Sequence, residues 1–151
     1  MKKFNTHHFG EITYDPANII RFPQGLPGFP EDINFLFMSE SDDEDMFFWL
    51  QSLDNGEVAF TLMDVYRVLP NYDPQIDDYE SEELGTIEED SLEIYNIVVI
   101  PEDARQMRVN LKAPVVINNA TGIGRQVICI NEEYQLRYMI FEELEKKQVK
   151  D

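Results

Sequence analysis

The sequence predicts an all-β fold with mostly antiparallel strands, and three observations support this. Short runs rich in branched and aromatic residues recur along the chain, separated by turns rich in Gly, Pro, Asn and Asp. Two of these runs are joined by Asn55-Gly56, a dipeptide typical of tight hairpins. Hydrophobic residues make up 43% of the chain and aromatic residues 12%, which is too much for a disordered chain.

The length favours a single domain. A chain of 151 residues can bury most of its apolar surface but is too short for two independent cores. We expect one β domain over residues 1–141, followed by a charged tail or short helix over residues 142–151. The N-terminus lacks the apolar stretch of a secretory signal, and no run of about 18 apolar residues occurs, so the sequence predicts a cytoplasmic protein without a membrane segment.

The N-terminal third begins with extended pieces at residues 3–9, 11–14 and 17–22. The next segment, FPQGLPGF at residues 22–29, is expected to be an ordered loop. Pro23 and Pro27 fix φ, whereas Gly25 and Gly28 supply the positive φ that tight turns need. We interpret this loop as a structural anchor whose two ends, Phe22 and Phe29, pack on the core.

The middle of the chain predicts a hairpin and a helix. Residues 33–38 form a strand of nearly continuous apolar character, and residues 47–53 and 57–63 pair through a primed turn at Asn55-Gly56. The acidic run at residues 76–84 is expected to form a short helix. Further strands are expected at residues 92–100, 107–113, 115–117, 126–130 and 134–141, with a turn at 118–124.

Negative charge is concentrated in the middle of the chain. The net charge is −18, and residues 22–104 contain 22 acidic residues but one basic residue, Arg67. Direct binding of nucleic acid is disfavoured there, because phosphate contacts need clustered Lys and Arg. A basic protein partner fits this region better, although acids also serve simply to keep a small domain soluble.

The sequence contains little that is typical of catalysis. Walker A, H-E-x-x-H, G-x-S-x-G and Cys/His cluster motifs do not occur, so we expect no cofactor and no metal. Adjacent His7 and His8 would face opposite sides of a strand and could not share a metal ion. The single cysteine, Cys129, lies in an apolar run and is expected to be buried and inert.

Three segments carry a resemblance to a known family. FPQGLPGF at 22–29, FFWLQSLDNGEVAF at 47–60, and NLKAPVVIN at 110–118 followed by QVI at 126–128 resemble, in this order and spacing, the bacterial flagellar assembly factor FliW family. The similarity covers nearly the whole chain. It implies a compact, barrel-like, non-enzymatic domain, with one or two short helices, that binds flagellin and the RNA-binding translational repressor CsrA. It also implies that the free factor antagonises CsrA, so that flagellin translation resumes.

The acidic middle of the chain is the predicted contact surface for CsrA, whose RNA-binding function implies a basic surface. LPNYDPQI also resembles a segment of the family, and it combines an aromatic residue with acids. The predicted partner-binding residues are Asn71, Tyr72, Asp73, Asp77 and Asp78. Many family members have Asn-Pro-Phe where this chain has residues 64–66, Asp-Val-Tyr, so the connector before this segment differs in shape. We expect a monomer.

Two other functional classes remain open from the residues alone. An acidic β domain that binds calcium or carbohydrate would need its acids to converge on an ion. Residues 42–45, Asp-Asp-Glu-Asp, offer carboxylates but lack the glycine and spacing of an EF-hand loop. A hydrolase with a carboxylate pair would need an acid with a strongly raised pKa in a cleft.

Overall fold

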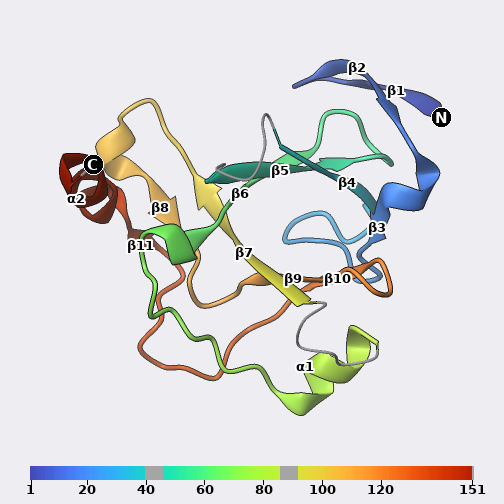
Figure 1. The fold of residues 1–151 in the computed structure, drawn as a ribbon. Helices are drawn as coiled ribbons and strands as arrows, with labels where there is room; N and C mark the ends of the chain where they lie inside the picture. Colours follow the sequence, from blue (N-terminus) through green and yellow to red (C-terminus); the bar gives the residue numbers. More distant parts are fainter. Residues whose placement is uncertain (40–45, 86–91, 151) are drawn as a thin grey trace.

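The computed structural model describes residues 1–39, 46–85 and 92–150. Among these residues, seven strands form a closed ring in the order β7-β6-β5-β4-β3-β10-β9, because β9 also pairs with β7 (Figure 1). The strands of this barrel are β3 (Ile19–Arg21), β4 (Asn34–Met38), β5 (Phe47–Ser52), β6 (Ala59–Met63), β7 (Leu92–Val99), β9 (Val115–Asn118) and β10 (Ile123–Gln126). The predicted all-β, barrel-like fold is confirmed.

The barrel closes through one short parallel contact. All other neighbouring strands run antiparallel, but β10 runs parallel to β3 and shares one register pair with it, Ile123 with Arg21. The Arg21 N–H also donates to the carbonyl oxygen of Gly122 at 2.8 Å. After Arg21 the chain leaves the barrel wall and enters the loop at residues 22–29.

Apolar side chains from opposite walls fill the barrel, since alternate residues of each strand face inward. Phe22 and Phe35 are fully buried and meet edge to face with ring centroids 5.3 Å apart. Phe37, Phe48 and Tyr95 form a second aromatic group, with ring centroids 5.0–5.3 Å apart. The buried members of this core are Phe22, Leu26, Phe35, Leu50, Leu62, Val115 and Ile117.

A second core lies outside the barrel. The end of β7 pairs with β8 (Arg108–Val109), which pairs with β11 (Tyr138–Met139), and α2 (Phe141–Lys150) follows. Leu144 of α2 packs against this cluster. Its buried members are Met63, Val65, Tyr72, Val98, Met107, Val109, Leu111 and Ile140. The C-terminal segment is therefore helical and packs on the domain.

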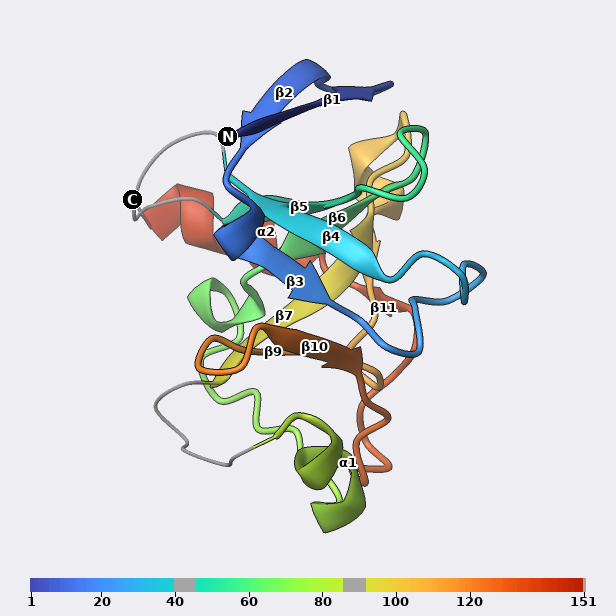
Figure 2. The same cartoon turned by 90° about the vertical axis from the view of Figure 1, so that its right-hand side faces the viewer.

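The N-terminal hairpin, β1 (Lys2–Thr6) and β2 (Gly10–Tyr14), lies on the side of the barrel formed by β4 and β5, and α1 (Asp78–Glu83) lies on the opposite side, near β9 and β10 (Figure 2). The His7 N–H donates to the Gly56 carbonyl oxygen at 2.9 Å. A Cβ atom at Gly56 would lie 2.4 Å from the Asn5 carbonyl oxygen. Glycine is thus required at residue 56 because the hairpin approaches its backbone.

The β5–β6 hairpin is confirmed, but its predicted primed turn is wrong. Within the described residues no non-glycine residue has positive φ, and Gly56 is not among the positive-φ glycines. The loop is longer, because the last residue pair is Gln51 with Ala59. Ser52 Oγ accepts the N–H groups of Asp54 (3.1 Å) and Asn55 (3.0 Å), and these bonds organise the loop without left-handed residues.

Three predicted strands are shorter or displaced. The strand expected at 126–130 is instead β10, which ends at Gln126, and those expected at 107–113 and 134–141 shrink to β8 and β11. The inward alternation at Met107, Val109, Leu111 and Ala113 is correct, since all four are buried. Irregular neighbours explain the shortening: the N–H groups of Val127, Cys129 and Ile130 donate to Pro114, Lys112 and Gln75, none of them in a strand.

The remaining helical elements are short. Helix α1 confirms the helix predicted at 76–84. Three 3-10 helices, η1 (Pro16–Asn18), η2 (Val65–Arg67) and η4 (Ala104–Gln106), begin after aspartates whose side chains accept a backbone N–H two residues on. The connector at residues 64–66 is therefore an Asp64-capped turn that leads into the predicted partner-binding segment.

Candidate functional site: an acidic surface beside a tyrosine-lined groove

The predicted contact residues lie between η2 and the first turn of α1. Asn71, Asp73, Asp77 and Asp78 are exposed, whereas Tyr72 is only 5% exposed. The structure thus places the three aspartates on the surface and turns Tyr72 into the second core. Asp77 has a structural task as well, because its Oδ1 accepts the Tyr79 N–H at 2.8 Å at the start of α1.

Tyr72 is held by two buried hydrogen bonds. Its hydroxyl donates to the Leu111 carbonyl oxygen at 2.6 Å and accepts from Asn96 Nδ2 at 3.0 Å. Its ring packs between Tyr66 and Tyr134, with centroids 5.6 and 4.8 Å away. Burial raises the pKa of Tyr72 well above its ordinary value, so the hydroxyl is neutral and available for both bonds.

Asn131 fixes the segment after Tyr72. Asn131 Oδ1 accepts the Gln75 N–H at 2.7 Å, and Asn131 Nδ2 donates to the Asp73 carbonyl oxygen at 3.1 Å. The Asp73 N–H donates to the Tyr134 hydroxyl at 2.8 Å, and the Ile130 N–H donates to the Gln75 carbonyl oxygen at 2.8 Å. Residues 73–75 and 130–134 therefore lie side by side, although they are more than 50 positions apart.

This neighbouring segment brings apolar residues that the sequence analysis missed. Ile128 and Ile130 are 68% and 61% exposed, while Val127 and Cys129, which alternate with them along the chain, are buried. Residues 127–130 are apolar throughout, so the sequence predicted a strand at 126–130 with a buried Cys129 but gave no sign that Ile128 and Ile130 face outward. The acidic surface, defined here as Asp73, Asp77 and Asp78, thus has exposed isoleucines on the adjoining segment. Exposed apolar groups beside charges are typical of protein interaction surfaces.

A groove of about 360 Å³ lies beside the acidic surface. We call it the tyrosine groove, lined by Val68, Leu69, Pro70, Asn71, Tyr72, Leu111, Glu133, Tyr134, Gln135 and Tyr138. The Tyr138 hydroxyl donates to Glu143 Oε1, and this bond, ahead of burial, raises the pKa of Tyr138 to about 12. The groove therefore combines apolar walls with a carboxylate at Glu133 and another beside Tyr138.

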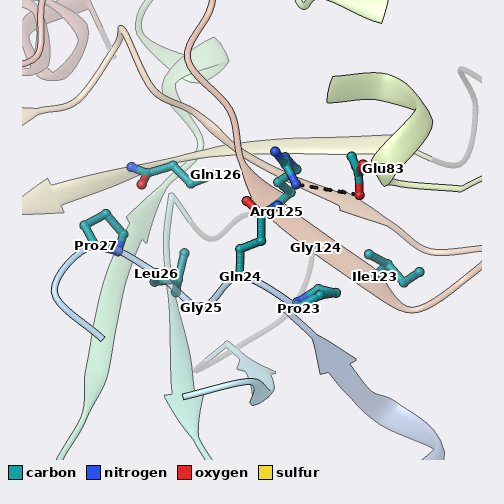
Figure 3. A pocket seen from close by; sticks show the side chains of 10 residues that line it. All are labelled: Pro23, Gln24, Gly25, Leu26, Pro27, Glu83, Ile123, Gly124, Arg125 and Gln126. Atoms are coloured by element: carbon teal, nitrogen blue, oxygen red, sulfur yellow. Dashed lines mark ion pairs between the residues drawn. The ribbon is translucent and has the colours of Figure 1, made fainter. Parts of the chain in front are cut away.

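A second cavity, of about 230 Å³, lies between residues 23–27 and strand β10 (Figure 3). Arg125 extends toward Glu83 of α1, with Nη1 and Oε2 4.0 Å apart, and its Nε also donates to Glu80. Two carboxylates thus compensate the guanidinium charge. We interpret the ion pairs as a connection between α1 and the barrel, and not as a site for an anion.

The loop at residues 22–29 has the backbone that its glycines predict. Gly25 and Gly28 have φ of 67° and 84°, and Leu26 forms an isolated bridge with Phe29. Phe22 is fully buried, but Phe29 is 41% exposed and meets Phe60 edge to face, with ring centroids 5.8 Å apart. The expectation that both phenylalanines pack on the core is therefore correct for Phe22 and wrong for Phe29. The exposed Pro23 and Pro27 lie on the wall of the second cavity.

No described group of three or more His, Cys, Asp or Glu residues could hold a metal ion. The acids at residues 42–45 lie outside the described residues. Asp32 has a pKa raised by burial and by the nearby Asp54, but it lines neither of the two cavities. Cys129 is buried as a free thiol, as expected. In the described part of the chain, no helix has the length and apolar character needed to cross a membrane.

Comparisons with known proteins agree with this fold. The model of the family described as FliW protein matches residues 3–140. The flagellar assembly factor FliW of Thermoanaerobacter pseudethanolicus is 40% identical over 142 residues, which cover 94% of this chain and 95% of that protein. The one from Alkaliphilus metalliredigens is 38% identical over 143 residues, covering 95% and 88%. A crystal structure of the flagellar assembly factor FliW superposes with a TM-score of 0.83 at 31% identity, covering 92% of this chain and 96% of the other.

Proposed function

This chain belongs to the FliW family of flagellar assembly factors, and from that premise we propose that it acts by binding two proteins, the translational repressor CsrA and flagellin. In this proposal it is a monomeric, cytoplasmic and non-enzymatic factor. Flagellin occupies it until export, and the released factor then antagonises CsrA, so that flagellin translation resumes. The family match over residues 3–140 is the observation that carries the flagellar role.

Charge supports CsrA as a partner. An RNA-binding repressor presents basic surface, and this chain has a net charge of −18 with its acids concentrated in residues 22–104. Opposite charges accelerate association and select the correct partner, more than they add to the final affinity. The same charge disfavours direct binding to the RNA that CsrA recognises.

We place the CsrA contact on the acidic surface and on Asn71. Asp73, Asp77 and Asp78 are exposed, and Asn131 and Tyr134 hold the backbone at Asp73 through the bonds at 3.1 and 2.8 Å. A surface that is already ordered loses little conformational entropy on binding. Tyr72 contributes by position, because its buried hydroxyl fixes the segment from beneath. In the same way, we propose that the loop of residues 22–29 is a structural anchor.

Binding assays with purified proteins test this proposal. In titration calorimetry the chain should bind CsrA and should bind flagellin, and flagellin added first should reduce CsrA binding. Affinity for CsrA should fall as salt rises from low to physiological concentration. Absence of binding to both proteins at low salt would refute the proposal, and binding of both at once without interference would refute the exchange of partners.

A further inference from the structure

The tyrosine groove has the size of a pocket for one large side chain. Its volume of about 360 Å³ is at the lower end of the range of roughly 300–1,000 Å³ found for ligand pockets. It is open to solvent, and residues 68–72 and 133–138 supply most of its lining, so a side chain of a partner could enter it. We propose that the tyrosine groove receives an apolar side chain from a basic segment of a protein partner.

The walls of the groove are held in place without a ligand. The Tyr72 hydroxyl bonds to Leu111 and Asn96, and the Tyr134 hydroxyl accepts the Asp73 N–H. The Leu69 N–H donates to the Val65 carbonyl oxygen at 2.7 Å, which fixes the turn that forms another wall. A pre-formed pocket spends little of its binding free energy on ordering its own side chains.

The walls select an apolar occupant. Val68, Leu69 and Pro70 supply aliphatic carbon, and Tyr72 and Tyr134 add aromatic rings. Both functions of the Tyr72 hydroxyl are used, because it donates to Leu111 and accepts from Asn96. A polar side chain entering here would lose its water without gaining an equivalent partner from Tyr72, whereas an apolar one gains from burial.

The charges around the groove select the sequence on either side of that apolar residue. Glu133 lines the groove, Asp73 follows Tyr72, and the Glu143 carboxylate accepts from Tyr138. Three bases lie on or next to the lining segments: Arg67 pairs with Asp64 at 3.6 Å, the half-buried Lys112 donates to the Asn131 carbonyl oxygen at 2.6 Å, and Arg137 is exposed. Lys or Arg next to the inserted residue would therefore meet complementary charge.

This inference deepens the proposed function and rests on it for the identity of the partner, since that proposal assigns a basic surface to CsrA. The groove itself can be tested without either protein. Three synthetic peptides of equal length serve as probes: alternating Leu and Lys, alternating Leu and Glu, and alternating Ser and Lys. Methyl-labelled full-length protein reports the site through the resonances of Val68, Leu69 and Leu111.

The Leu-Lys peptide should shift these three resonances and bind at least tenfold more tightly than either other peptide. Gln135→Trp should weaken its binding at least tenfold by filling the groove, because Gln135 lines it with an exposed side chain while its backbone carbonyl oxygen bonds Leu111 and Lys112. Leu136→Trp is the matched control, since Leu136 is 62% exposed and does not line the groove. It should change affinity less than twofold.

Several results would overturn the inference. These are equal effects of the two Trp variants, equal binding of all three peptides, shifts confined to Ile128 and Ile130, or a dimer in sedimentation that Gln135→Trp dissociates. If the peptides fail but CsrA and flagellin bind the wild type, the groove assignment falls and the proposed function stands. If neither protein binds but the Leu-Lys peptide enters the groove, the proposed function falls and the groove assignment stands.

Discussion

The Tyr72 hydroxyl donates a hydrogen bond of 2.6 Å to the carbonyl oxygen of Leu111, which is 39 positions further along the chain. The same hydroxyl accepts from Asn96 of β7 at 3.0 Å. These bonds join the segment that leads to the acidic surface to the second core. The backbone that presents Asp73 is therefore coupled to the stability of the domain through one buried side chain.

Replacing Tyr72 with Phe should lower the free energy of unfolding by about 1–3 kcal/mol. The change keeps the ring but removes the partner of the Leu111 carbonyl oxygen and of Asn96 Nδ2, and both groups stay buried. Urea denaturation measures the loss. Tyr79→Phe is the control, because Tyr79 is 61% exposed, and it should change stability by less than about 0.5 kcal/mol. Equal effects of both changes would contradict this account.

Asp54 should stabilise the fold in its ionised form. Burial is the largest single influence on its pKa and raises it, but hydrogen bonds from the backbone N–H groups of Asn34 (2.9 Å) and Ile33 (2.7 Å) and from the Asn34 side chain together lower the pKa below its ordinary value. Its contribution is therefore present above the unfolded-state pKa and is lost as pH falls through the folded-state pKa. Asp54→Ala should cost about 1–2 kcal/mol at pH 7. Urea titrations should show this cost shrinking as pH falls below about 4.

The contribution of Asp32 to stability should change with pH in the opposite direction to that of Asp54. Burial, followed by the negative charge of Asp54, raises the pKa of Asp32, and Asp32 Oδ2 has no hydrogen-bond partner within the part of the chain that the structure describes. The stabilising contribution is thus present below the unfolded-state pKa and is lost as pH rises through the folded-state value. Asp32→Asn removes the charge and should raise the urea midpoint at pH 7. A midpoint that stays the same or falls at pH 7 would show that the ionised carboxylate is well solvated.

Alanine substitutions at Gly25 and Gly28 distinguish the cost of backbone strain from the cost of a steric clash. Both glycines have positive φ, so alanine at either position should cost roughly 1–2 kcal/mol of conformational energy. A Cβ atom at Gly28 would meet nothing within 4 Å, whereas one at Gly25 would lie 2.4 Å from the Phe29 carbonyl oxygen and 2.6 Å from Pro30 Cα. Gly25→Ala should therefore destabilise the protein clearly more than Gly28→Ala in thermal unfolding. Equal losses would mean that the loop moves aside at little cost.

Local patterns predicted the elements whose partners are close in sequence. The β5–β6 hairpin, the short acidic helix α1 and the positive φ of Gly25 and Gly28 all follow from residues within a few positions of one another. The closure of the barrel does not, because it depends on one parallel pair, Ile123 with Arg21, about 100 positions apart. The barrel-like shape came from the family resemblance, since no local pattern encodes that pair.

In the candidate site, too, some features follow from local sequence and others depend on contacts between distant segments. Acidic residues at 73–78 are evident from composition, but the inward direction of Tyr72 depends on a carbonyl group at Leu111. Ile128 and Ile130 point outward because the backbone around them bonds to Lys112 and Gln75, in two separate segments. The tyrosine groove is formed by residues near 70, 111 and 135 together. Contacts between distant segments decide these features, and a one-dimensional pattern does not contain them.

CsrA binding should depend on where the acidic residues lie and not only on the net charge of the chain. Reversing Asp73 and Asp78 to Lys should weaken CsrA binding about tenfold or more at low salt and flatten its salt dependence. Asp77 is left unchanged, because its side chain accepts the Tyr79 N–H and its loss would disturb α1. The matched control reverses Glu31 and Glu57, two exposed acids in the β3–β4 and β5–β6 loops, and alters the net charge equally. Calorimetry over a salt series measures both variants. If net charge alone governs binding, the two variants will lose the same affinity, and the assignment of the contact to residues 71–78 will be wrong while the family role stands.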